Sequence, residues 1–589
     1  MKGPAARFVL PGVAAVVVVA GLLVWRGAGP GVPTSELAGS ATDSGLTPAT
    51  GGRLVATYRT EPSNYNRLAG DLTPDELVRL LTQDSLVRLS RATGDLEPRL
   101  AREWSRSDDG LSWTLQLRED VRFSDGTPFT AADVLFSFEA ALDPLLASGL
   151  AGALTIGGEP VSVRAMDDHT VVVTLPAPYG PGLSVLDGLP ILPRHKLAAA
   201  LEAGTLRQAW APGTPPVEVV GLGPFVLALH RAGERLVFER NPHFWGRDED
   251  GAPLPYLDAI ELQIIPEQNA EMLQLESGAV DLVSDFVRAE DIATLRRLEA
   301  AGELQLVEAG VSPNASGLWF NLTGKADEGR PWLQSEAFRR AVSLAVNRQA
   351  IVETVYLGQA VPIYGPVTPG LGDWHADLPQ TPHDPEAARA LLREAGLTDA
   401  DGDGRLEDPS GQPARFTILT QAGNDARTRT VSLIQSDLAA VGIAAVAQPL
   451  DVPTLIDRYS RAVYDTMYFG VDTTAADPAG LRDFWLSSGG MHFWNPEQAS
   501  PATDWEARID DLFRRHMTTV DREERQRLFA EAQRVLAEHL PIIHFAAPTV
   551  TIAMRARVGG AQPSVFVPPV LWNAERLFVT SALPGVPGR

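Results

Sequence analysis

None of the 589 residues is a cysteine, and this absence constrains the fold more than any other single feature. A chain without cysteine has no disulfide framework, thiolate metal site, cysteine nucleophile or iron–sulfur cluster, and no lipid attached through a thiol. The composition is otherwise that of a globular protein, with 44% apolar and 21% charged residues. A chain of this length has room for roughly three or four domains, so the size of its core is not limiting.

The net charge excludes one class of partner. Fifty Lys and Arg residues face 74 Asp and Glu residues, which gives a formal charge of −24. This excess repels the phosphate backbone, so we expect no nucleic-acid partner, and it disfavours binding to an anionic membrane surface.

The N-terminus has the pattern of a membrane-inserting segment. Residues 8–25 contain no charged residue, and as a helix they would reach about 27 Å, enough to span a hydrocarbon core. Because Lys2 and Arg7 are basic, the N-terminus before this apolar segment is expected in the cytoplasm. Residues 1–26 are therefore either a cleaved signal peptide or a retained membrane anchor, and in both cases the body is exported.

Residues 27–52 are rich in Gly, Pro, Ser, Thr and Ala, and this composition predicts a flexible tether. The segment also holds an A-x-A-like cleavage site at Ala38–Ser40.

The exported body mixes strands and helices. Residues 111–118 alternate between apolar and polar side chains, which predicts a half-buried strand, and Thr130 with Asp133 has the spacing of a capping box. Helical periodicity is stronger in the second half. It predicts helices over residues 337–357, after the Asp384–Pro385 cap, and after Asp521. Further strands are expected at residues 171–175, 236–239, 260–265 and 415–420. The fold class is thus α/β, of the α+β kind with mixed sheets.

The usual enzyme motifs are missing. There is no G-x-S-x-G elbow, H-E-x-x-H helix, phosphate-binding glycine loop or dinucleotide-binding fingerprint, and the ten His residues are scattered. We therefore expect a protein that is not an enzyme.

One local motif suggests a metal. Asp399, Asp401 and Asp403 occupy alternate positions before a glycine, as in an oxygen-ligand calcium loop, and Glu407 suits a later ligand position. Ser410 stands where a 12-residue loop needs its bidentate glutamate. The segment is either a calcium site or an acidic turn.

Aromatic residues gather at four places, which are residues 319–321, 464–469, 484–485 and 493–495. Such clusters arise either from core packing or from a ligand cleft lined by amphipathic rings.

Several segments follow one another in an order more specific than any single motif. They are residues 97–104, 108–118, 121–134, 221–225, 240–245, 320–321, 338–348, 383–396, 399–404 and 524–543. Together they resemble the extracellular solute-binding proteins of family 5, which are the peptide, oligopeptide and nickel-type binding components of ABC importers. The resemblance covers residues 52 to 577 and implies a two-lobed, three-domain clamshell that closes on its ligand at a hinge.

The resemblance also implies how the domains are divided. Lobe I would be discontinuous and built from residues 53–86, 217–310 and 541–580. Domain II would be an insertion over residues 87–216, and lobe III would span residues 311–540.

The ligand anchor is where the sequence departs from the family. Peptide-binding members carry an aspartate four residues before a proline, and here Thr474 stands at that place while Asp472 lies two residues earlier. Asp472 is either a charge anchor for an ammonium group or a turn residue. The resemblance and the aromatic clusters make Trp319, Asn321, Trp485 and Trp494 the expected cleft residues.

These observations predict a monomeric receptor in the periplasm or on the extracytoplasmic face of the membrane. It would deliver a peptide or similar small solute to the permease subunits of an ABC importer, with no cofactor other than a structural calcium ion. Two alternatives remain: the same fold binding an oligosaccharide, an opine or a metal chelate, or a membrane-tethered sensor or chaperone-like module that binds a partner protein.

Overall fold

The computed structural model describes residues 46–70, 72–283, 285–323, 330–470, 477–496 and 498–580. The predicted signal peptide or anchor and most of the predicted tether lie outside these residues. Within the described part, no helix has the length and apolar character needed to cross a membrane. Residues 46–52, expected in the tether, pack against the body: the Gly51 N–H donates to the Tyr256 carbonyl at 2.7 Å. The body therefore begins before Arg53.

The sheet of lobe I has eight strands drawn from distant parts of the chain. Its order is β10-β11-β12-β1-β13-β21-β14, with β16 paired to β21, and β1 runs parallel to β12 and β13. The strands are β1 (Arg53–Tyr58), β10 (Phe225–Arg231), β11 (Arg235–Arg240), β12 (Ala259–Ile264), β13 (Leu282–Val283), β14 (Leu304–Val311), β16 (Ala360–Pro362) and β21 (Ala546–Arg555). Its helices are α1 (Thr73–Thr82), α4 (Gln268–Glu276) and α5 (Ile292–Ala300).

Domain II is built on a four-stranded antiparallel sheet in the order β4-β5-β9-β8. The strands are β4 (Ala101–Arg106), β5 (Ser112–Leu117), β8 (Ser162–Asp167) and β9 (Thr170–Thr174), covered by α2 (Ala131–Leu142) and α3 (Arg194–Glu202). The predicted alternation is confirmed, because Trp113, Leu115 and Leu117 of β5 are buried. The capping box is confirmed as well, since Asp133 accepts a hydrogen bond from the Thr130 N–H. One apolar core runs through lobe I and domain II, so these two parts form a single lobe of the clamshell.

Lobe III has a five-stranded sheet in the order β18-β17-β19-β15-β20. Its strands are β15 (Ser316–Phe320), β17 (Arg415–Gln421), β18 (Ala444–Leu450), β19 (Thr466–Gly470) and β20 (Ile542–His544). Its helices are α6 (Glu336–Ala345), α7 (Arg348–Thr354), α8 (Pro385–Glu394), α9 (Asp425–Ala440), α10 (Val452–Ser460), α11 (Arg482–Trp485), α12 (Asp504–Thr518) and α13 (Arg522–His539). Because β20 pairs with β15, the chain returns to lobe I after His544, whereas the expected boundary lay at residue 541.

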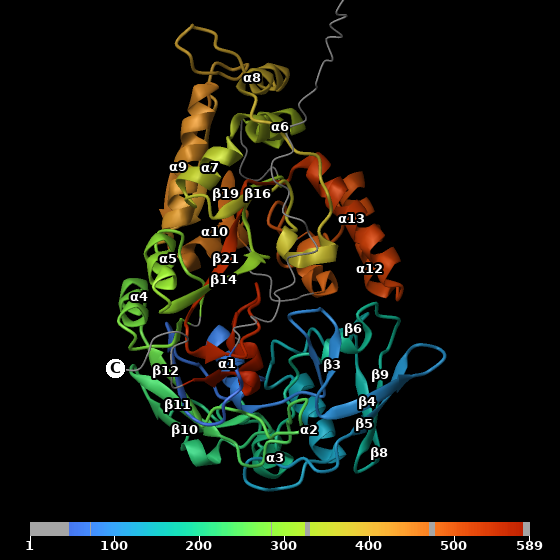
Figure 1. The fold of residues 1–589 in the computed structure, drawn as a ribbon. Helices are drawn as coiled ribbons and strands as arrows, with labels where there is room; N and C mark the ends of the chain where they lie inside the picture. Colours follow the sequence, from blue (N-terminus) through green and yellow to red (C-terminus); the bar gives the residue numbers. More distant parts are fainter. Residues whose placement is uncertain are drawn as a thin grey trace, which may run out of the picture.

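Short elements complete the structure. They are β2 (Val87–Leu89), β3 (Leu96–Pro98), β6 (Thr155–Ile156), β7 (Glu159–Pro160), β22 (Val558–Gly559), β23 (Phe578–Val579) and the 3₁₀ turns η2 (Gly182–Leu186), η3 (Pro216–Glu218), η4 (Pro331–Gln334), η5 (Pro369–Trp374), η6 (Pro478–Leu481) and η7 (Leu571–Arg576). In Figure 1 blue, green and red segments share the lower half, whereas the upper half is yellow to red, so lobe I is assembled from both ends of the body.

The long helix expected over residues 337–357 is two helices. α6 ends at Ala345, and α7 begins three residues later with Asn347 as its cap, whose side chain accepts the Ala350 N–H at 3.0 Å. Val346 and Asn347 are extended, which turns the chain between the two helices. Asparagine satisfies a free N–H of a helix start, so this break has a local cause that the apolar periodicity does not reveal.

Candidate ligand-binding cleft

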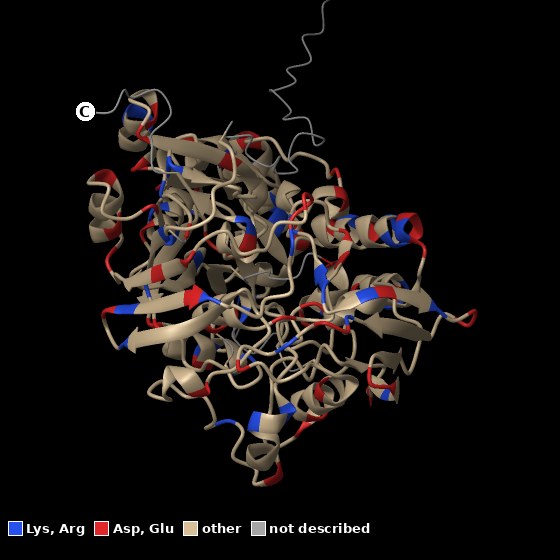
Figure 2. Cartoon of the chain, turned by 60° about the horizontal axis from the view of Figure 1, so that its bottom comes forward, with Lys and Arg blue, Asp and Glu red and all other residues tan. Residues whose placement is uncertain are grey.

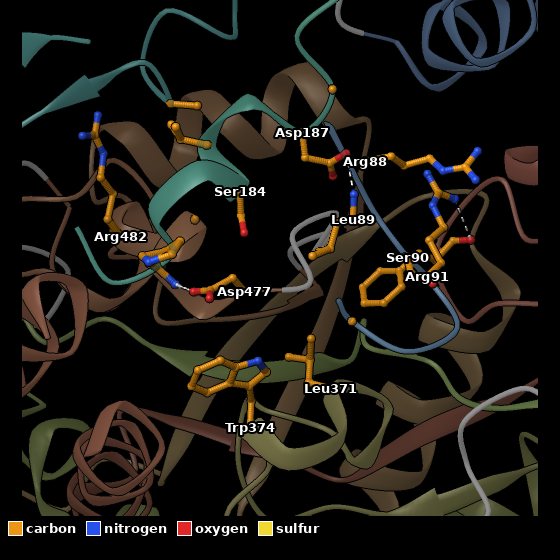
Figure 3. A pocket seen from close by; sticks show the side chains of 18 of the residues that line it. Arg88, Leu89, Ser90, Arg91, Ser184, Asp187, Leu371, Trp374, Asp477 and Arg482 are labelled. Carbon is orange, nitrogen blue, oxygen red and sulfur yellow. Dashed lines mark hydrogen bonds between the residues drawn. The ribbon is translucent and has the colours of Figure 1, made fainter. Parts of the chain in front are cut away.

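A cavity of about 1390 Å³ lies between the two lobes. Domain II and the adjoining part of lobe I, lobe III and the late return segment all contribute to its wall. The main stretches are residues 88–94, 177–179, 184–185, 187–188, 369–374, 479–480, 482–483 and 563–567, together with Asp477 and Leu486. Figure 3 shows Asp187 and Ser184 on one side of this space and Trp374 and Leu371 on the other. The wall is therefore assembled from segments that are far apart in sequence.

One lip of the cavity is closed by backbone contact between the lobes. The Gly180 N–H of domain II donates to the Met517 carbonyl at the end of α12, at 2.6 Å. A Cβ atom at Gly180 would lie only 2.4 Å from the Thr519 carbonyl oxygen. The close approach of the lobes therefore requires glycine at this position.

The lobe III side of the wall is organised by Arg525. Its guanidinium donates to both carboxylate oxygens of Asp477, at 2.8 and 2.5 Å, and lies 4.9 Å from the centre of the Trp374 ring. Asp477 in turn accepts the Ala479 N–H and so begins η6. A fork of two parallel hydrogen bonds fixes both groups in orientation.

His516 supports the same arginine from behind. Its Nδ1 lies 3.0 Å from the Arg525 carbonyl oxygen, and its Nε2 lies 3.3 Å from Nη2 of the guanidinium. Burial, followed by the positive charge of Arg525, lowers the pKa of His516 to about 4. The imidazole is thus neutral at physiological pH, with Nδ1 donating and Nε2 accepting, and it adds no repulsive charge.

Three predicted cleft residues lie in the interior of lobe III. Trp319 and Trp494 stack at 6.0 Å, and their indole N–H groups donate to the Phe469 carbonyl and to Glu506. Trp485 is 2% exposed and stacks on Phe513. None of the three indoles lines the cavity, because their apolar surface is buried inside the lobe, where Trp319 and Trp494 also find acceptors for their N–H groups.

Asn321 is also an internal residue. Its side-chain amide donates to the carbonyls of Ala462 and Tyr464, at 2.9 and 2.8 Å, and joins the end of β15 to the loop before β19. It is absent from the cavity wall. The fourth expected group, Asp472, lies outside the described residues, as does Thr474.

The acidic loop brings three of its four predicted ligands together. The carboxylate oxygens of Asp399, Asp401 and Asp403 lie within 4.8 Å of one another and are exposed. Glu407 instead accepts the Ala400 N–H at 2.9 Å. The three aspartates could hold a hard cation, and calcium at this loop stays a prediction.

Several wall residues have no counterpart in the sequence predictions. Residues 88–94 and 369–374 carry no motif that distinguishes them from ordinary turns. The one available signal is the Gly- and Pro-rich stretch at residues 177–182, which indicates an irregular segment. Figure 2 shows acidic and basic residues interspersed over the body, so local pairs inside the cavity decide its electrostatics.

Two known proteins that are similar to most of this chain are both named as binding proteins. A probable ABC transporter-binding protein of Deinococcus radiodurans is 28% identical over 536 residues, which cover 87% of this chain and 89% of that protein. The di/tripeptide-binding protein 2 of Pseudomonas aeruginosa is 27% identical and covers 82% of this chain and 86% of its own.

A solved structure shares the fold. The oligopeptide-binding protein AppA of Bacillus subtilis, in complex with a nonapeptide, aligns with a TM-score of 0.70 at 24% identity and covers 91% of this chain and 100% of its own. The family described as bacterial extracellular solute-binding proteins, family 5 (middle), matches residues 95–493. This match spans more than half of the 589 residues, so the chain belongs to the bacterial extracellular solute-binding proteins of family 5.

Proposed function

We propose that this chain is an extracytoplasmic receptor that captures a peptide or similar small solute between its lobes and passes it to the permease of an ABC importer. The cavity is the observation that supports this function. It is shared by both lobes, and the contact between Gly180 and Met517 closes one lip. Its volume of about 1390 Å³ exceeds the roughly 300–1,000 Å³ of common small-molecule pockets, so a ligand of several residues has room.

Two relatives support a peptide as the ligand. The Pseudomonas relative is named for di- and tripeptides, and the Bacillus structure holds a nonapeptide. The receptor works as a monomer outside the inner membrane, either free or held by residues 8–25, and it releases its ligand chemically unchanged.

The identity of the bound solute tests this function. The full chain is purified without added ligand, and the molecules that co-purify are read by mass spectrometry. A peptide library is then screened by thermal shift, where a ligand at 100 times its dissociation constant adds about 2.7 kcal/mol to the free energy of unfolding. Stabilisation by a peptide supports the proposal. Stabilisation only by an oligosaccharide, an opine or a metal chelate would replace it with the first alternative.

A further inference from the structure

Most charged side chains in the cavity wall already have an ionic partner. Arg67 and Arg79 pair with Glu76, Arg88 with Glu575, Arg482 with Asp483, Arg514 with Asp510, Arg522 with Asp373, and Arg525 with Asp477. Among the described residues of the wall, Arg91 and Asp187 remain, and neither has an oppositely charged group within 4.0 Å. These two charged groups line the cavity without an ion pair to the described residues.

Asp187 is held in place by a backbone contact. It follows η2, and its Oδ1 accepts the Leu89 N–H at 3.1 Å, as the dashed line in Figure 3 shows. The residue is exposed at the cavity surface. Desolvation raises the pKa of its carboxyl group, and the positive charge of Arg79 opposes this shift in part. The ionised carboxylate is therefore less stable than it would be in open water, and a cation bound in the cavity would stabilise it.

Arg91 carries the opposite charge, and its charged form is also destabilised by burial. Its Nη1 donates to the carbonyls of Phe566 and Pro568, at 3.4 and 2.8 Å. Nε and Nη2 make no hydrogen bond to the described residues. Burial lowers the pKa of Arg91 to about 10, although Glu76 and Asp187 act against the shift, so the group is still positively charged at neutral pH. Two donors of a partly desolvated guanidinium are thus available to an anion.

The two charges stand on one stretch of the wall. Leu89, which holds Asp187, precedes Arg91 by two residues, so their Cα atoms lie within about 7 Å of each other. Trp374 and Leu371 of lobe III face this stretch from across the cavity (Figure 3). One short ligand that carries both signs of charge can therefore reach both groups.

We propose that this part of the cavity is a subsite for a zwitterionic ligand, in which Asp187 accepts the ligand's ammonium group and Arg91 donates to its carboxylate. The subsite rests on the proposed capture function and narrows its ligand class to molecules whose amino and carboxyl groups are both free. It lies on the side of domain II and its junction with lobe I, and it does not depend on Asp472.

Calorimetry with three peptides tests the subsite on the full chain. The probes are Ala-Ala-Ala, its N-acetyl form and its C-terminal amide. We expect either block to weaken binding about tenfold or more, the usual effect of losing one charge-assisted hydrogen bond. The Asp187→Asn variant should bind free Ala-Ala-Ala about tenfold more weakly and should no longer respond to acetylation. The Asn side chain still accepts the Leu89 N–H, so folding is preserved.

The Arg91→Gln variant should also bind free Ala-Ala-Ala about tenfold more weakly, and it should lose the response to amidation while keeping the response to acetylation. Asp167→Asn is the matched control, because Asp167 also accepts a backbone N–H, from His169 at 2.9 Å, but lies outside the cavity wall. Its binding should equal that of the wild type.

The possible failures are distinguishable. If the wild type binds the peptides and Asp187→Asn binds free Ala-Ala-Ala unchanged, or if acetylation costs the wild type nothing, the subsite is wrong and the capture function stands. If the wild type binds none of the three peptides, the subsite is refuted, and the capture function is then decided by the co-purified solute and the peptide library.

Discussion

The two walls of the cavity are built in different ways. On the lobe III side, Asp477, Arg525 and His516 satisfy one another, and Trp374 covers the guanidinium. On the opposite side, Arg91 and Asp187 face the cavity with no ionic partner within 4.0 Å among the described residues. The charged groups of the lobe III wall therefore have their ionic partners before a ligand binds. Those of the opposite wall gain ionic partners only from the ligand. A receptor that uses its walls in this way can keep its shape when empty and still gain charge interactions on binding.

Removal of Arg525 from the lobe III wall should cause the largest loss of stability. Its side chain is 5% exposed, and Arg525→Met leaves Asp477 without its partner at the base of η6. Breaking a buried ion pair from one side costs roughly 3–5 kcal/mol of folding free energy, which urea unfolding measures. Arg522→Met is the control, since Arg522 also lies over Trp374 but is 54% exposed. An equal loss in both variants would show that the lobe III wall does not depend on the Arg525 pair.

A second test asks whether lobe III is held together internally by charge. Burial raises the pKa of the Glu506 carboxyl, but hydrogen bonds from His492, Trp494, Gln498 and Thr503 outweigh it and hold the pKa at about 2. The folded pKa lies below the unfolded value of 4.5, so the carboxylate contributes stability above pH 4.5 that is lost as the pH falls toward 2. The contribution is roughly 3 kcal/mol.

The expected result is a pH-dependent difference between two proteins. The unfolding free energies of the wild type and Glu506→Gln should differ most at neutral pH and converge between pH 4.5 and about 2. Glu531→Gln, whose carboxylate is 43% exposed and pairs with Arg508, should follow the wild type at every pH. A constant gap between the wild type and Glu506→Gln across this range would contradict the assigned pKa.

Local structure was predictable where its cause lies within a few residues. The alternation of β5, the Thr130–Asp133 box and the Asp384 cap of α8 all follow from neighbouring side chains, and the structure confirms them. The sequence does not reveal the division of the helix at Val346, because the apolar periodicity continues across the break.

The cavity could not be predicted in the same way. Residues such as Arg91 and Asp187 become neighbours only through long-range folding, and no local pattern distinguishes them. Clustered indoles suit a cleft as well as a core, so the sequence favours neither place for Trp319, Trp485 and Trp494. Their burial, together with the indole hydrogen bonds of Trp319 and Trp494, shows that they belong to the core.

A substitution at Gly180 should have a smaller effect on stability, and it tests whether the contact at this lip sets the distance between the two lobes. Gly180→Ala should separate the lip from Met517, because the added Cβ atom collides with a backbone oxygen that cannot rotate away. The lobes can relieve this clash by opening, so the free energy of unfolding should fall by only about 1 kcal/mol, while small-angle scattering should show a larger radius of gyration. Gly490→Ala is the control, since no atom lies within 4 Å of its Cβ position. Identical scattering from both variants would mean that the lip contact does not set the separation of the lobes.

The acidic loop of Asp399, Asp401 and Asp403 provides the weakest expected effect, and its test separates the stability of lobe III from ligand binding. The loop follows α8, which lies at the top of Figure 1, and none of the residues 399–407 lines the cavity. Three exposed carboxylates without the terminal glutamate indicate a millimolar site, so about 10 mM calcium should stabilise the protein by about 1 kcal/mol. Asp403→Asn should abolish this gain in a thermal-shift titration, whereas Asp457→Asn should leave it intact. Calcium should not change the affinity for Ala-Ala-Ala, because neither Asp187 nor Arg91 contacts this loop. If calcium changed the affinity for Ala-Ala-Ala, the loop would be energetically coupled to the cavity. The lobe III side and the Arg91–Asp187 side could then not be treated as independent.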